Sequence, residues 1–150
     1  MIYRKARYEE IPLLLELRKK QLVDEGIAAS INIDNSLKSF FERHMSDDTL
    51  VEWVAEDCGK IVATAALLFQ EFPPTFTNPN DINIKGYVTN MYTAPQYRGR
   101  GIAKKLLDIL VIEAREHNVL KIWLGASKMG KPVYLDYGFE GADIWLELNV

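Results

Sequence analysis

Residues 86–103 read GYVTNMYTAPQYRGRGIA and combine three structural signals in one order. The aromatic and β-branched residues at 87–93 predict a strand, which a proline ends. A glycine-rich basic turn follows at 96–101, and from Ile102 onward apolar residues recur at helical spacing. A strand, a glycine turn and a helix in this order bring free backbone N–H groups to the positive end of a helix. Together with the two arginines of the turn, they predict a site for a pyrophosphate.

Two other phosphate-binding motifs are less well matched. A dinucleotide fingerprint that begins at Gly99 would need Gly or Ala where Lys104 stands, so a nicotinamide or flavin fold is not expected. Residues 125–131, GASKMGK, have the spacing of a P-loop. The next residue is Pro132, which has no hydroxyl for Mg²⁺, and too little chain follows for the rest of a P-loop domain. A nucleotide-binding protein that uses 125–131 is therefore the weakest of the alternatives.

Two motifs resemble a known family. Gln96-x-x-Gly99-x-Gly101, followed by Ile102 and Ala103, is similar to the Q/R-x-x-G-x-G/A signature of the GNAT superfamily of acyl-CoA-dependent N-acetyltransferases. The run VYLDYGF at 133–139 resembles the closing L-Y-x-x-x-G-F element of that family and lies at the expected distance. The resemblance extends over nearly the whole chain. It implies one N-acetyltransferase domain over residues 1–150 that transfers an acetyl group from acetyl-CoA to a primary amine of a small molecule or peptide.

The resemblance also implies site residues for acetyl-CoA, the cosubstrate. Backbone groups of Met91 and Thr93 are expected to pair with the pantetheine arm, and the Met91 amide is the expected oxyanion-hole donor. Ser127 stands where many members carry an asparagine near the thiol. The pyrophosphate cradle would consist of the backbone amides of consecutive residues, namely Arg98, Gly99, Arg100, Gly101, Ile102 and Ala103.

Tyr134 matches the tyrosine that serves the family as general acid toward the leaving thiolate. An ordinary phenol pKa, about 10, suits this role. The general base stays open, because residues 87–93 contain no carboxylate. The alternatives are a water chain, an amine that arrives already deprotonated, or a remote acid such as Glu25, Glu71 or Asp81. The missing strand glutamate also leaves open a different function, that of an acyl-CoA-binding regulatory module without turnover. Among acetyltransferases, the alternative is a peptide or protein N-terminal acetyltransferase.

Bulk composition limits the partners. The chain has 18 Lys and Arg against 21 Asp and Glu, a net charge of -3, so neither nucleic acid nor a membrane is an expected partner. Cys58 is the one cysteine, which excludes an intramolecular disulfide and suggests a reducing, cytoplasmic location. The two histidines and one cysteine lack the spacing of a structural metal site, so no metal is expected. A monomer and a homodimer both stay open.

The order of elements predicts an α/β fold with helices on both faces of the sheet. The sheet is expected to be mixed and largely antiparallel, with about six to seven strands and a splayed central pair. A long loop is expected at 70–85, where no steady period is present. Helices are expected at 9–22, from Asp34 or Asn35, from Ile102 and at 131–137; strands are expected at 2–6, 50–56, 61–69, 87–93 and 120–124, at Phe139 and at 144–148.

Overall fold

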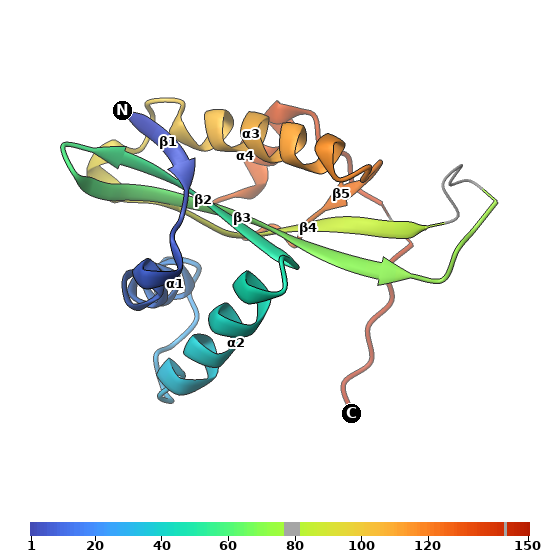
Figure 1. Cartoon of the computed structure of the whole chain (residues 1–150), viewed down its shortest axis with the longest axis horizontal. Coiled ribbons are helices and arrows are strands. Elements are labelled where there is room, and N and C mark those ends of the chain that lie inside the picture. The colour runs from blue at the N-terminus through green and yellow to red at the C-terminus, as the bar shows by residue number, and fades with distance from the viewer. Residues whose placement is uncertain (77–81, 143) are drawn as a thin grey trace.

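The computed structural model describes residues 1–76, 82–142 and 144–150. Within these ranges five strands form one sheet in the order β1-β2-β3-β4-β5, and all neighbours are antiparallel except β4 and β5 (Figure 1). This architecture confirms the expected mixed, largely antiparallel sheet. The strands are β1 (Ile2–Lys5), β2 (Leu50–Asp57), β3 (Lys60–Phe72), β4 (Asn83–Thr93) and β5 (Ile122–Trp123).

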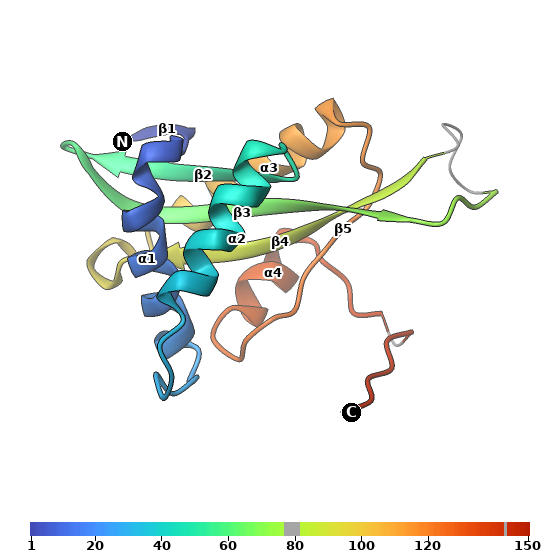
Figure 2. The same cartoon turned by 60° about the horizontal axis from the view of Figure 1, so that its bottom comes forward.

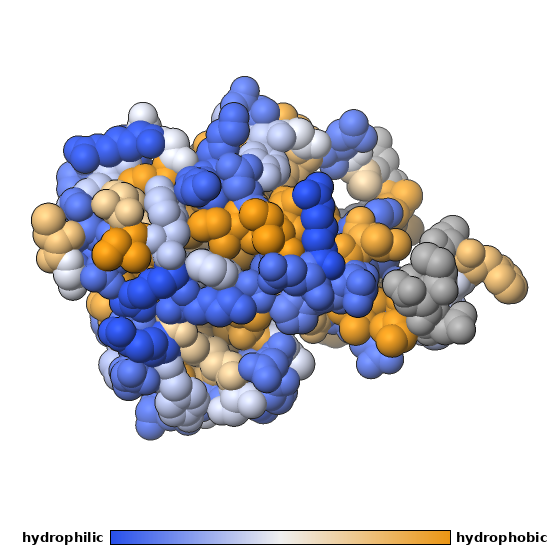
Figure 3. Space-filling view, turned by 45° about the horizontal axis from the view of Figure 1, so that its top comes forward, coloured by the Kyte–Doolittle hydropathy of each residue, from blue (hydrophilic) through white to orange (hydrophobic). Residues whose placement is uncertain are grey.

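Helices cover both faces of the sheet, as expected. The helices α1 and α2 lie next to each other across one face (Figure 2), and α3 packs on the other with α4 beside it. The surface on the α3 side carries mainly hydrophilic side chains with apolar ones between them (Figure 3). Among the described residues, no helix is both long and apolar enough to cross a membrane. The helices are α1 (Ile11–Asp24), α2 (Asp34–Ser46), α3 (Ile102–Glu116) and α4 (Lys131–Tyr137), with 3-10 turns η1 (Tyr8–Glu10) and η2 (Pro95–Tyr97).

The strand β3 is the centre of the fold and separates two hydrophobic cores. Residues 61–67 are all buried, which explains their nearly continuous apolar sequence. Ala65 and Leu67 belong to the core under α3, whereas Ile61 and Ala66 belong to the core under α1 and α2. The small alanine side chains let both layers approach the sheet closely.

The strands β4 and β5 separate after a short contact. They pair only at Gly86 with Ile122 and at Tyr87 with Trp123, so the rest of β4, up to Thr93, has no strand partner on that side among the described residues. This confirms the expected splayed pair. The register between β3 and β4 also shifts between Thr64 and Ala66. The last part of β4 is therefore a distorted strand with one open side.

Two expectations are wrong: the length of the loop at 70–85, and the strands at Phe139 and 144–148. The loop expected at 70–85 is shorter, because β3 continues to Phe72 and β4 begins at Asn83; residues 77–81 lie outside the described part. The strands expected at Phe139 and at 144–148 do not form, which leaves five strands among the described residues instead of six or seven. An apolar run such as 144–148 has a high strand propensity, but it becomes a strand only when it pairs with a neighbouring strand. β5, the last strand of the sheet, has only two residues and offers few backbone groups for such pairing.

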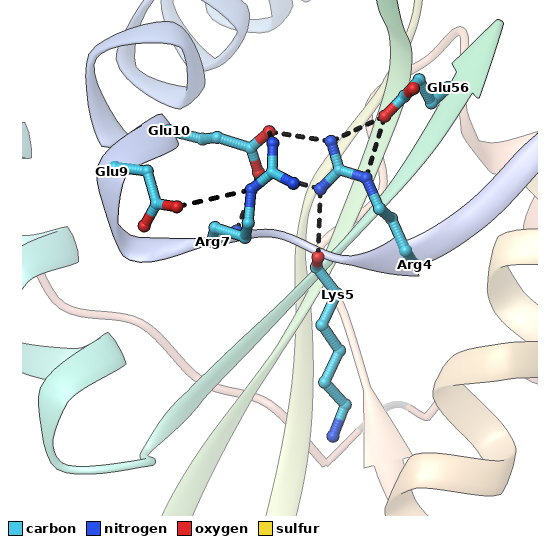
Figure 4. A network of polar contacts seen from close by, with 6 residues as sticks. All are labelled: Arg4, Lys5, Arg7, Glu9, Glu10 and Glu56. Atoms are coloured by element: carbon cyan, nitrogen blue, oxygen red, sulfur yellow. Dashed lines mark hydrogen bonds and ion pairs between the residues drawn. The ribbon is translucent and has the colours of Figure 1, made fainter. Parts of the chain in front are cut away.

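An ion-pair network fixes the start of α1 to the edge of the sheet (Figure 4). The terminal nitrogens of Arg4 donate to Glu10 at 2.7 and 2.9 Å, and its Nε donates to Glu56 on β2 at 2.9 Å. The backbone N–H of Arg7 also donates to Glu10, at 2.8 Å. The Arg4 hydrogen bond is the main reason why the pKa of the Glu10 carboxyl falls to about 2. The network sets the position of α1, whose far end lies at the candidate site.

Candidate functional site

The glycine turn between β4 and α3 is open to solvent. Gly99 and Gly101 have φ angles of 72° and 77°, in the left-handed region that favours glycine. A Cβ atom on either residue would meet no atom within 4 Å. The helix α3 begins directly afterwards at Ile102, and the first N–H groups of a helix have no partner within it. Open space over these amides is what an anion-binding cradle requires.

The arginines of this turn are already engaged with other protein groups. The Nε of Arg98 donates to the Thr93 carbonyl at 2.9 Å, and its terminal nitrogen pairs with Asp24 of α1. The Arg100 guanidinium lies over the Tyr97 ring, 5.0 Å from its centroid. The Arg98 backbone N–H also donates to the Pro95 carbonyl, at 3.3 Å, so neither the charge nor the amide of Arg98 is unengaged in this structure. The Thr93 carbonyl, expected to face pantetheine, retains one lone pair for that contact.

Asn90 and Met91 form a bulge in β4. Asn90 has a φ of 53°, and both residues are skipped in the register with β3. The Thr64 hydroxyl of β3 donates to the Asn90 carbonyl at 2.7 Å and so stabilises the bulge. The Met91 side chain packs against the core under α3. A core role for the Met91 side chain is thus compatible with a ligand-binding role for its backbone.

A buried carboxylate beneath the bulge escaped the sequence analysis. Glu52 of β2 is 3% exposed, and the Asn90 side-chain amide donates to it at 2.9 Å. Ala66 of β3 stands opposite Glu52, and its small side chain leaves room for this contact across the sheet. Burial raises the pKa of Glu52 to about 8, although the Asn90 hydrogen bond and the charge of Arg18 act in the opposite direction. The sequence of β2 did contain a signal for this burial, because side chains of a strand alternate between its two faces. Glu52 therefore shares the inward face with Leu50 and Val54, both of which are buried.

Tyr134 lies on α4 and lines a cavity of about 680 Å³ between α4 and the β5 edge. Its hydroxyl has no hydrogen-bond partner among the described residues. Burial, followed by the charge of Glu25 and the nearby Tyr87, raises the pKa of the Tyr134 phenol to about 12. The hydroxyl is therefore protonated at neutral pH and free to donate to a ligand.

Ser127 shapes the loop that precedes α4. Its hydroxyl accepts the Gly130 N–H at 3.1 Å, and its carbonyl accepts the Lys131 N–H at 2.9 Å. These bonds close the turn that leads into the short helix that carries Tyr134. The Ser127 hydroxyl thus already has a local function, which the sequence motif does not reveal. The P-loop-like run 125–131 ends where this turn meets the first residue of α4.

Two of the three candidate bases, Glu25 and Glu71, lie in the described part of the chain. Glu25 follows α1 and lies near enough to Tyr134 to act on its pKa. Glu71 is exposed near the far end of β3, opposite Ile84, and Asp81 lies outside the described residues. No group of three or more His, Cys, Asp or Glu side chains in the described part of the chain could hold a metal ion.

Comparisons with known proteins agree with this geometry. Residues 49–141 match the family model of the acetyltransferase (GNAT) domain. A predicted acetyltransferase from Clostridium acetobutylicum, whose crystal structure contains acetyl-CoA, is 53% identical, with a TM-score of 0.94 over 99% of this chain and 95% of that one. A GCN5-related N-acetyltransferase from Ralstonia eutropha has the same fold, with 24% identity and a TM-score of 0.87 over 99% of this chain and 97% of that one.

A more distant relative is the glucosamine 6-phosphate N-acetyltransferase of Trypanosoma brucei brucei. It is 29% identical over 92 residues, which are 61% of this chain. The match spans only 59% of that protein, less than two thirds of its length. The family model, in contrast, matches more than half of this chain. The fold of the Clostridium acetobutylicum protein also superposes on 99% of this chain. The chain therefore belongs to the GNAT acetyltransferase family.

Proposed function

We propose that the protein transfers the acetyl group of acetyl-CoA to a primary amine of a small molecule or peptide. The amine attacks the thioester directly in a ternary complex, and the whole of residues 1–150 acts as one domain. The unpartnered Tyr134 hydroxyl is the observation that carries this proposal. A protonated phenol with no protein partner suits protonation of the departing thiolate.

The donor side of the proposal rests on the open turn and the bulge. The pyrophosphate binds the backbone amides at 98–103, and the pantetheine arm follows the open side of β4 along Met91 and Thr93. The bulge at Asn90 turns the Met91 amide out of the β3 register, which suits an oxyanion-hole donor. Removal of such a donor typically costs about 10²–10³ in rate.

The acceptor side rests on charge. Glu25, directly after α1, lies near enough to Tyr134 to act on its pKa, and a carboxylate at this entrance favours a cationic amine. The neighbouring Asp24 is already paired with Arg98 of the glycine turn. The single cysteine, Cys58, lies in the β2–β3 turn and not beside Tyr134, which supports direct attack over a cysteine-bound acetyl intermediate. A peptide amino group is the alternative acceptor within the class.

The first experiment compares the ligands by thermal shift. Acetyl-CoA, NAD and Mg-ATP are tested at matched concentrations, since a ligand at 100 times its Kd stabilises a protein by about 2.7 kcal/mol. Stabilisation by acetyl-CoA alone is expected. Thiol release is then followed with a panel of primary amines, including glucosamine 6-phosphate and a short peptide. Binding of acetyl-CoA without release for any amine would favour the regulatory module, and stabilisation by Mg-ATP would favour the 125–131 loop.

A glycine substitution tests the cradle. Gly101→Ala is expected to weaken acetyl-CoA binding at least about tenfold, because a left-handed alanine costs about 1–2 kcal/mol and the turn then relaxes away from the φ of 77° that brings its amides together. Gly59→Ala is the matched control. Gly59 has the same φ of 77° and the same open surroundings, but it lies in the β2–β3 turn. Calorimetric titration of both variants measures the affinity, and equal losses of affinity would count against the cradle.

A further inference from the structure

The end of α1 lies between the last residues of β4 and the helix α4. Asp24, the last residue of α1, pairs with Arg98, whose Nε donates to the Thr93 carbonyl at the end of β4, at 2.9 Å. The next residue, Glu25, lies near enough to Tyr134 of α4 for its charge to act on the phenol. Two adjacent carboxylates thus reach two different parts of the site, and the second one points to the group that protonates the thiolate.

A buried amide holds the side chain of Glu25. Gln21, one turn earlier in α1, is 7% exposed, and its side-chain nitrogen donates to the Glu25 carboxylate at 3.0 Å. The side-chain oxygen of Gln21 accepts a hydrogen bond from Arg18, also at 3.0 Å. A buried amide that is engaged at both its oxygen and its nitrogen has little freedom to turn. The carboxylate of Glu25 is therefore oriented, although the residue itself is exposed.

The position of Glu25 is unfavourable for the helix. Among the described residues no cation pairs with its carboxylate, whereas the charge of Asp24 is balanced by Arg98. Glu25 also follows the last residue of α1, where a negative charge meets the negative end of the helix dipole. An oriented carboxylate without a counter-ion at such a place is better explained by contact with a ligand than by a contribution to the fold.

Two other carboxylates do not suit the role of general base. Glu71 stands opposite Ile84, near the end of β4 that is remote from Met91. At about 3.3 Å per residue, the stretch of β4 from Ile84 to Met91 is roughly 20 Å long. Glu52 is buried, and burial raises its pKa to about 8, so at pH 7 it already holds a proton. Of these three acids, Glu25 is the one whose charge acts on Tyr134.

We propose that Glu25 is the general base of the acetyl transfer and that Gln21 orients it, an inference that rests on the proposed function. The neutral amine attacks the thioester carbon, and as the C–N bond forms, a proton of the nitrogen passes to the Glu25 carboxylate. The C–S bond then breaks with its electron pair on sulfur, which takes the proton of the Tyr134 hydroxyl. The proton on Glu25 replaces the one that Tyr134 has lost, so both groups return to their starting state. An acceptor that arrives as an ammonium ion first releases one proton to solvent.

Glu25→Gln tests the role of base. The variant keeps the size of the side chain and an oxygen for the Gln21 amide, but it cannot take up the proton. We expect kcat to fall about 10²- to 10⁴-fold in steady-state kinetics with the best amine of the panel. The affinity for acetyl-CoA, measured by calorimetry, is expected to stay unchanged. The urea midpoint is expected to stay the same or to rise, because a negative charge leaves the end of α1.

Glu16→Gln is the matched control. Glu16 lies on the same helix, its side chain is 58% exposed, and it pairs with Lys19 at 2.7 Å. This variant removes the same charge from α1 away from Tyr134, so it is expected to keep the wild-type kcat.

Gln21→Leu tests the orientation of the base. In the wild-type background it is expected to lower kcat about ten- to a hundredfold, because a displaced catalytic group loses its geometry. In the Glu25→Gln background it is expected to have no further effect, since the group that it orients is already absent. A loss of the same size in both backgrounds would show that Gln21 serves only the fold.

The outcomes for Glu25 separate the base from the transfer itself. If the wild type transfers acetyl groups and Glu25→Gln keeps its kcat, or changes only in the KM for the amine, the base role is overturned and the proposed function stands. A wild type that releases no thiol with any amine overturns both.

Discussion

Replacement of Tyr134 by phenylalanine is expected to lower kcat by about 10²- to 10⁴-fold, the usual contribution of a general acid. The substitution removes only the hydroxyl, which has no protein partner within the described residues, so the fold and its packing against Phe139 are retained. The KM for acetyl-CoA and its thermal shift are expected to stay near the wild-type values. Steady-state kinetics with the best amine of the panel measures both constants.

Tyr137→Phe is the matched control for this variant. Tyr137 lies on the same helix, but its hydroxyl donates to Asp108 of α3 at 2.9 Å. Its loss is expected to cost some stability and to leave kcat within a few-fold. If Tyr134→Phe kept wild-type kcat, or if both variants lost activity equally, the acid role of Tyr134 would be excluded. Because its pKa is about 12, titration of Tyr134 is also not expected to limit kcat at any pH below about 10.

The second large effect is on stability and concerns Glu52. Its pKa rises from 4.5 to about 8 on folding, so below pH 4.5 both the folded and the unfolded state hold the proton. Between these two values the unfolded state loses the proton and the folded state keeps it. The free energy of unfolding of the wild type therefore decreases as the pH rises from 4.5 through 8, by an amount on the order of a few kcal/mol.

Glu52→Gln removes this titration and keeps an oxygen for the Asn90 amide. The variant is expected to gain stability relative to the wild type as the pH rises from 5 to 8, and urea unfolding at several pH values measures the difference. Asn90→Gly tolerates the φ of 53° but removes the hydrogen bond that lowers the pKa of Glu52. Its pH-dependent loss of stability should continue to a higher pH than that of the wild type, because one proton sets the slope and the folded pKa sets where the loss ends. A difference between Glu52→Gln and the wild type that does not vary with pH would refute the raised pKa.

The elements that local sequence determines were predicted well. The strand, glycine turn and helix around Gly99 and Gly101 follow from residues adjacent in the chain, and so does the helix that carries Tyr134. Glu52 was missed because its importance depends on Asn90, 38 residues away, and on the small Ala66 between their strands. The segment 144–148 has the composition of a strand, yet only the Trp145 ring contacts Trp123 of β5, and no strand pairing forms there among the described residues. Propensity describes what a segment can form, whereas pairing depends on what lies beside it.

The β2–β3 turn has a practical consequence. Cys58 is exposed there with a φ of 49°, and the adjacent Asp57 accepts the Tyr97 hydroxyl at 2.9 Å, beneath the Arg100 guanidinium. A fluorophore attached to this one thiol would sit a few contacts from the glycine turn, without a second site of labelling to confuse the signal. The same thiol reacts with the reagents that detect free CoA. Each chain thus adds one equivalent of background, which a Cys58→Ser protein removes.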